Sequence, residues 1–256
     1  MNPKDSPLQE NVPERDTASA ETTYAETTYA DTTDKEARRT IVLYSSKYGA
    51  AKTYAEWIAA SLDCRVCELS AFTKKELQDY DIILYGGGVQ AGGIRGLEQF
   101  TKWIRSDLKL RQMARRGTIS KEDAEGTGAF DKQYYIFAVG ISLDTPENRL
   151  QLRDINFDKD WLRDLPCFFL PGAFDPAKLA GVDKAIIKVA AKMFQDKSQE
   201  QAASEDAKVL HYFENGCDLI DRTRIQPLLE AVRSGSVPEE FRDLREPEPK
   251  KSFWKR

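Results

Sequence analysis

One strand–loop–helix stretch, residues 40–60, constrains the fold of this chain more than any other segment. Ile41-Val-Leu-Tyr44 is a short β-branched and aromatic run, which is typical of a buried strand. Apolar residues then recur at helical spacing from Tyr54 to Leu62, which predicts an amphipathic helix. A hydroxyl- and glycine-bearing turn, Ser45–Gly49, joins the two. The stretch therefore predicts a buried strand that leads through a tight turn into a helix.

The turn has the features of an anion-binding loop. The N–H groups of a first helical turn lack partners inside the helix, and the helix dipole favours negative charge there. Ser45 and Ser46 add hydroxyl donors, and Gly49 lets a ligand approach the backbone closely. Two interpretations stay open on these residues alone: a phosphate site, or an ordinary strand-to-helix turn whose serines cap the helix.

Further strands and helices alternate along the rest of the chain. The strand-like runs are residues 64–69, 80–85, 133–140 and 165–170. The helical patterns lie at about residues 97–104, 146–152, 181–196 and 206–234. Such alternation favours a parallel α/β sheet with right-handed crossovers. Ligands of such sheets bind at the carboxyl ends of the strands, near the point where the strand order reverses.

Glycine is concentrated in one stretch, residues 86–96, directly after the run at 80–85. Six of these eleven residues are glycine, so we expect an open loop rather than a helix or a sheet interior. Such a loop offers bare backbone on which a flat ligand can lie. The alternative is a flexible connector.

Charge and composition narrow the function classes. Residues 1–39 hold nine acidic and five basic residues, which accounts for the whole formal charge of −4 and leaves 33 of each sign elsewhere. The absence of a basic excess argues against a nucleic-acid partner. Residues 1–39 and 236–256 are predicted to be disordered or flexible tails around one domain at 40–235. The N-terminus has no apolar signal-peptide core, so we expect a cytoplasmic location with reduced thiols.

Candidate catalytic groups are scarce. Cys64 and Cys67 have the spacing of a redox motif, but both fall on a predicted strand, which favours packing over redox or metal use. His211 is the single histidine and lies in the last helical region, where we expect a structural role. No catalytic residue is predicted, so any chemistry must come from a cofactor.

Three segments carry a family resemblance. The turn Ser45-Ser-Lys-Tyr-Gly-Ala-Ala-Lys-Thr53 resembles the Ser/Thr-x-Thr-Gly-x-Thr phosphate loop of the flavodoxin superfamily. Residues 167–176 and 181–194 resemble the last strand, Gly-Ala turn and lysine-bearing helix of the branch typified by menaquinone-dependent protoporphyrinogen IX dehydrogenase; residues 215–232 resemble its closing helix. The resemblance covers about residues 40–234. It implies an α/β, flavodoxin-like three-layer sandwich with a five-stranded parallel sheet of order 2-1-3-4-5.

The resemblance implies FMN as the cofactor. Its phosphate would contact Ser45, Ser46, Lys47, Gly49 and Ala50. The flavin would be flanked on one side by Gly88, Val89, Gln90, Ala91, Gly92 and Gly93, and on the other by Gly140, Ile141 and Ser142. The glycine-rich stretch lacks an aromatic residue that could stack on the flavin, and only Tyr48, within the phosphate loop, is near enough in sequence to bind the cofactor in this way. Ala51 stands where the superfamily usually has a hydroxyl.

Two function classes follow from these features. The first is an FMN-dependent redox protein, either an oxidoreductase of the protoporphyrinogen dehydrogenase type or an electron carrier, with a small molecule such as a quinone, or a protein, as redox partner. The second is a non-enzymatic module that keeps the fold and has lost tight FMN binding, which Ala51 favours.

A peripheral contact with the inner face of a membrane is a further hypothesis. Lys184, Lys188 and Lys192 form a basic stripe beside the apolar residues Val182, Ile186, Val189 and Met193, and residues 250–256 add charge and aromatic rings. The alternative is a helix that packs on the sheet with solvated lysines.

Overall fold

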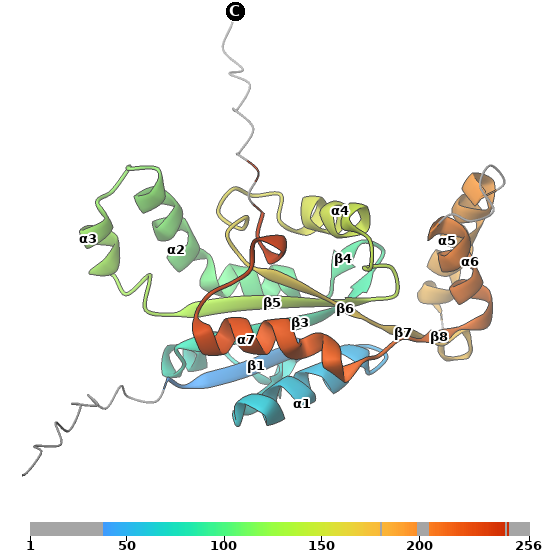
Figure 1. The fold of residues 1–256 in the computed structure, drawn as a ribbon, viewed down its shortest axis with the longest axis horizontal. Coiled ribbons are helices and arrows are strands. Elements are labelled where there is room, and N and C mark those ends of the chain that lie inside the picture. Colours follow the sequence, from blue (N-terminus) through green and yellow to red (C-terminus); the bar gives the residue numbers. More distant parts are fainter. Residues whose placement is uncertain (1–37, 180, 199–204, 244, 246–256) are drawn as a thin grey trace, which may run out of the picture. The chain divides into compact units, whose positions relative to one another are not determined.

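A parallel β-sheet forms the centre of the computed structural model, which describes residues 38–179, 181–198, 205–243 and 245 (Figure 1). Five parallel strands lie in the order β2-β1-β3-β5-β6. Their bounds are β1 Thr40–Ser45, β2 Arg65–Glu68, β3 Ile82–Gln90, β5 Gln133–Gly140 and β6 Cys167–Pro171. Numbered among themselves, these strands have the order 2-1-3-4-5, so the predicted fold class is confirmed.

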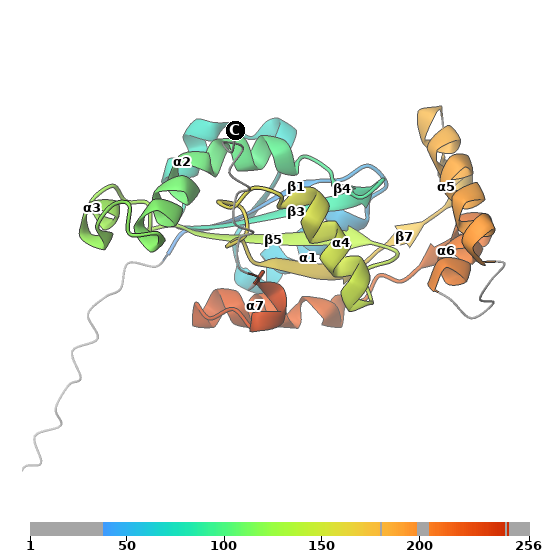
Figure 2. The same ribbon diagram turned by 90° about the horizontal axis from the view of Figure 1, so that it is seen from above.

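Helices cover both faces of the sheet and complete the three predicted layers. Helices α1 (Ala50–Leu62) and α7 (Gln226–Ser234) lie on one face, and α2 (Leu97–Arg115) and α4 (Pro146–Asn156) on the other (Figures 1 and 2). Shorter elements complete the connections: η1 Leu69–Ala71, η2 Lys74–Asp79, α3 Lys121–Glu125 and η4 Arg222–Ile225.

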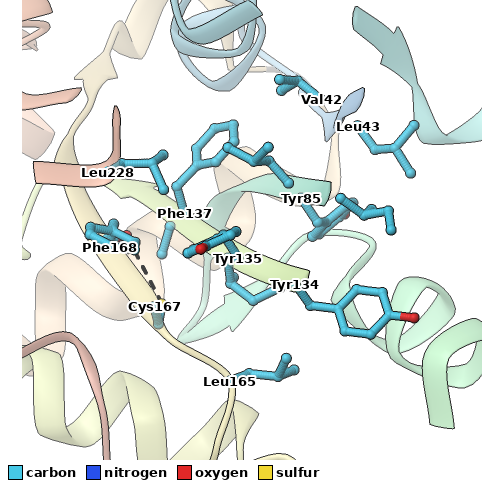
Figure 3. Close-up of a cluster of buried hydrophobic side chains, with 14 of the residues drawn as sticks. Val42, Leu43, Tyr85, Tyr134, Tyr135, Phe137, Leu165, Cys167, Phe168 and Leu228 are labelled. Carbon is cyan, nitrogen blue, oxygen red and sulfur yellow. Dashed lines mark hydrogen bonds between the residues drawn. The ribbon is translucent and has the colours of Figure 1, made fainter. Parts of the chain in front are cut away.

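The core fills both spaces between the sheet and its helices. Figure 3 shows side chains from neighbouring strands, among them Val42, Phe137 and Phe168, together with Leu228 of α7. Strands that are buried on both faces need apolar residues at successive positions rather than alternate ones. This explains why runs such as Ile41–Leu43, each of which is 0% exposed, were recognisable in the sequence.

The glycine-rich stretch is not the open loop that its composition predicts. Strand β3 continues through Gly86, Gly87 and Gly88, which pair with Phe137, Ala138 and Val139 of β5. A Cβ atom on Gly86 would lie 1.9 Å from the Phe137 ring. The expectation was wrong for residues 86–90, which continue the strand; Gly86 makes room there for a neighbouring ring, a use of glycine that a single sequence does not reveal.

A two-residue turn ends β3. Ala91 and Gly92 have positive φ angles of 49° and 79°, and they join β3 to the antiparallel strand β4 (Gly93–Ile94). Two successive residues with positive φ are the signature of a tight hairpin that matches the twist of its strands. Asn156, the last residue of α4, donates to the Gly92 carbonyl at 2.7 Å and accepts from the Ile94 N–H at 2.8 Å. The turn is therefore held in one position.

The predicted helix at 206–234 is interrupted. Helix α6 (Glu205–Asn215) ends at Gly216, whose φ is 79°, and strand β8 (Cys217–Asp218) then pairs antiparallel with β7 (Ala173–Phe174). The elements η3 (Pro176–Lys178), α5 (Val182–Ser198) and α6 lie between these two short strands. Helices α5 and α6 pack against each other beyond the β7–β8 ribbon (Figure 1).

The folded domain extends past residue 235. Phe241, in η5 (Glu239–Phe241), is 9% exposed and stacks on Phe168 with ring centroids 4.3 Å apart. Its carbonyl accepts a hydrogen bond from the guanidinium of Arg153. The rest of the two predicted tails, residues 1–37 and 246–256, lies outside the described residues. Across the described ranges, no helix is both long and apolar enough to cross a bilayer.

Candidate functional site

A cavity of about 420 Å³ opens at the carboxyl ends of the parallel strands. The segments that follow β1, β3, β5 and β6 form its walls on the sheet side, and α5 and α6 form the opposite wall. Its volume falls in the range of about 300–1,000 Å³ that is usual for small-molecule sites. The position is the one that an open α/β sheet offers a ligand.

Most of the predicted site residues meet at this cavity. They come from three separate segments: Ser46, Lys47, Tyr48 and Ala50; Gly88, Val89, Gln90, Ala91 and Gly92; and Gly140, Ile141 and Ser142. Ser45, Gly49 and Gly93 are not among the residues that line it. Ser45 is the last residue of β1, Gly49 is the N-cap residue of α1, and Gly93 pairs with Gln90 across the β3–β4 hairpin. Their contacts with FMN stay predictions.

The turn between β1 and α1 exposes backbone atoms toward the cavity. The Gly49 N–H donates to Ser46 Oγ at 3.1 Å, and the Gly49 carbonyl accepts from the Thr53 N–H at 2.9 Å. Gly49 has a φ of 100°, and a Cβ atom there would have no neighbour within 4 Å. Ala50 and Ala51 open α1 and line the cavity, so the positive end of the helix dipole is directed at it.

Hydrogen bonds also fix the wall that follows β5. Ser142 Oγ accepts from the amide of Asn148 at 2.8 Å, and the Leu143 carbonyl accepts from Arg149 Nε at 2.7 Å. The Gly172 N–H donates to the Gly140 carbonyl at 2.9 Å. A Cβ atom on Gly172 would lie 3.2 Å from the Gly140 backbone, so glycine permits this close approach.

The opposite wall contains a residue that sequence reasoning missed. Asp183, in the first turn of α5, is 6% exposed and lines the cavity. Its carboxylate accepts from the ammonium of Lys47, from the hydroxyl of Tyr48, and from Gln90 Nε2 at 2.6 Å. The bonds from Lys47 and Tyr48 lower the pKa of Asp183, and the Asp183 carboxylate in turn raises the pKa of Tyr48. The carboxylate is therefore ionised at neutral pH.

The same wall supplies apolar and aromatic surface. Ile187 of α5 and Val209 and Phe213 of α6 line the cavity together with Phe174 of β7, whose ring centroid lies 5.5 Å from that of Phe213. The cavity thus has aromatic rings, although the glycine-rich stretch contributes none. Residues 167–176 and 181–194 resemble a family pattern, but nothing in their local sequence shows that they turn back over the strand ends.

The cysteine and histidine residues considered as candidates in the sequence, Cys64 and His211, do not line the cavity. Burial raises the pKa of the Cys64 thiol to about 11, which makes it a poor nucleophile and agrees with a packing role. His211 is exposed and interacts with Asn215 of its own helix. Among the described residues, His, Cys, Asp and Glu side chains form no cluster of three or more that could hold a metal ion.

Comparisons with known proteins agree with the topology. The family model for the flavodoxin domain matches residues 41–119, which is less than half of the chain. The chain therefore contains a flavodoxin-like domain. No curated protein gives a significant match.

Solved structures with similar folds include a flavodoxin, WrbA-like protein from Agrobacterium tumefaciens. It is 20% identical, the match covers 47% of this chain and 70% of that one, and the TM-score is 0.32. Oxidised flavodoxin 2 from Bacillus cereus is 17% identical over 47% of this chain and 74% of its own, with a TM-score of 0.31. Because the sequence identities and TM-scores of both structures are low, they carry no argument here. The fold assignment rests on the strand order of the sheet and on the family model that matches residues 41–119.

Proposed function

We propose that the chain binds FMN in the cavity at the strand ends and works as a flavin-dependent redox protein. The observation that carries the proposal is the meeting of three backbone-rich segments with the N-terminus of α1 at one cavity. Bound FMN would supply the electron-transfer chemistry. The chain would hold and orient it.

The residues present fit this cofactor in two respects. The α1 N-terminus, Ser46 and Lys47 offer donors to a phosphate, and Gly49 leaves its surroundings open because a Cβ atom there has no neighbour within 4 Å. The same test at Gly88 also finds no neighbour within 4 Å, so a flat ring can lie against bare backbone. The apolar wall of Ile187, Val209 and Phe213 would exclude water from the opposite side.

The reaction class within this proposal is an oxidoreductase of the protoporphyrinogen dehydrogenase type, or an electron carrier. The redox partner is a quinone or another small molecule in the first case and a protein in the second. Neither class requires nucleic acid. The rival proposal, a fold module without tight flavin binding, is favoured by Ala51, which is 1% exposed and carries no hydroxyl, and by the carboxylate of Asp183 beside the phosphate loop.

Flavin titration separates the two proposals. Calorimetry with FMN, together with the visible absorption spectrum of the purified protein, should show one bound flavin per chain. Quinone reduction by the flavin-loaded protein then distinguishes an oxidoreductase from a carrier for protein partners. An absence of FMN binding at millimolar concentration would contradict the leading proposal and favour the fold module.

A peripheral membrane contact belongs to the same proposal, together with a cytoplasmic location. On α5, Val182 is 74% exposed and Val189 is 63% exposed, and the exposed lysines at 184, 188 and 192 follow the same helix. Among the described elements, α5 packs most extensively against α6, whereas the alternative expected it to pack on the sheet. Apolar groups flanked by lysines complement an anionic bilayer surface.

We expect co-sedimentation with phosphatidylglycerol vesicles at low salt. Replacing Lys184, Lys188 and Lys192 with glutamine should weaken it, since each lysine near anionic lipid contributes about 1 kcal/mol. The matched control replaces the exposed Lys74, Lys75 and Lys109, which lie on other elements, and should sediment like the wild type. A protein that stays in the supernatant would contradict this contact.

A further inference from the structure

The cavity lining contains a carboxylate, Asp183, that binds the same lysine as the phosphate of the proposed ligand would bind. Among the described residues that line it, Lys47 and Arg95 carry positive charge and Asp183 carries negative charge. Lys47 belongs to the predicted phosphate loop, yet its ammonium forms an ion pair with Asp183. A ligand phosphate at the α1 N-terminus would therefore meet a lysine that already has an anionic partner.

The ion pair is part of a polar link between α5 and the sheet-side walls. Asp183 bonds to Lys47 and Tyr48 from the segment after β1, and to Gln90 from the end of β3. Its side chain is 8% exposed, whereas that of Lys47 is 40% exposed. The carboxylate is thus the buried member, and the lysine is the member with room to change partner.

A second ion pair joins α6 to the sheet-side walls of the cavity. Lys208 bonds to Asp144 in the segment after β5, and their side chains are 39% and 47% exposed. Exposed pairs of this kind contribute little free energy. Asp183 is therefore the stronger polar contact of the two.

We propose that Asp183 is a specificity-determining residue that competes with a ligand phosphate for Lys47, and so reduces the preference of the cavity for phosphorylated over unphosphorylated flavins. The inference rests on the proposed function, because it assumes that a flavin occupies the cavity. It goes further in assigning to one residue of α5 the balance between FMN and riboflavin.

The test measures the dissociation constants of FMN and riboflavin by calorimetry in the wild type and in Asp183→Asn. Asparagine keeps the shape of the side chain and removes its charge. We expect the FMN-to-riboflavin affinity ratio to rise about tenfold, because one charge-assisted contact becomes available to the phosphate. Asp175→Asn, outside the cavity lining and able to keep its cap on Ala177, is the matched control and should leave the ratio unchanged.

The Lys47→Met background shows whether the gain passes through Lys47. Under the proposal, Asp183→Asn no longer raises the ratio in that background. A rise of the same size would mean general repulsion by the carboxylate and would overturn the competition. An unchanged or lower ratio in Asp183→Asn alone would overturn it as well.

Amide hydrogen exchange supplies a readout that needs no flavin. Loss of the carboxylate should speed exchange in the described parts of α5 and α6, and Asp175→Asn should not. Unchanged exchange in Asp183→Asn would show that the bonds from Asp183 to Lys47, Tyr48 and Gln90 do not stabilise α5, and would overturn the strong contact with Lys47 that the competition requires. If neither flavin binds to any variant, the proposed function fails, and exchange alone decides whether Asp183 holds α5 in place.

Discussion

Replacing Gly86 with alanine is expected to lower the free energy of unfolding by about 3 kcal/mol, at the upper end of the usual cost of overpacking. The added methyl group would lie 1.9 Å from the Phe137 ring, which is 0% exposed and surrounded by packed neighbours. Neither group can withdraw without moving the backbone of β3 or β5, which are paired at this position. Urea denaturation of both proteins measures the effect.

Two further variants assign the loss to this contact. Gly88→Ala is the matched control, because a Cβ atom there has no neighbour within 4 Å, and it should stay within about 0.5 kcal/mol of the wild type. Phe137→Leu replaces the ring with a smaller branched side chain that lacks the clashing atoms, so adding Gly86→Ala in that background should cost clearly less than it does alone. An equal loss in the free energy of unfolding in the two backgrounds would show that contact with the Phe137 ring is not the reason for glycine at position 86.

Gly86 also illustrates which features of the fold were visible in the sequence. The strands β1, β5 and β6 were predictable because burial on both faces demands continuous apolar runs such as Ile41–Leu43. The reason for Gly86 lies in Phe137, about fifty residues later in the chain, and no local pattern records that contact. Composition alone therefore predicted a loop at the residues through which the central strand β3 continues beyond Tyr85.

The site was predictable to a similar degree. The segments after β1, β3 and β5 were identified because the end of a strand and the start of a helix have local signals, such as Gly49 and the change of period at Ala50. The opposite wall was not identified, because it depends on the pairing of β7 with β8, two strands of two residues each that lie far apart in the sequence. Asp183 reads locally as an acidic residue in a helical first turn, a common position that indicates no ligand.

The turn before α1 allows the electrostatic part of the site to be tested apart from its shape. Gly49→Asp and Gly49→Asn add side chains of the same size at a φ of 100°, so both variants bear the same backbone strain and the same steric obstruction. They differ by one negative charge beside the α1 N-terminus. Comparing the two variants therefore isolates the interaction of that charge with the ligand.

We expect Gly49→Asp to bind FMN about a hundredfold more weakly than Gly49→Asn. A carboxylate about 6 Å from a phosphate dianion, at an effective dielectric constant of about 40, costs about 3 kcal/mol, and 1.4 kcal/mol corresponds to about a tenfold change in affinity. Riboflavin carries no phosphate, so its affinity should be the same in both variants. Calorimetry with both flavins measures this difference, and thermal unfolding checks that the two variants are equally stable. Equal FMN affinities would mean that the phosphate does not bind at this turn, and the proposed orientation of the ligand would have to be abandoned.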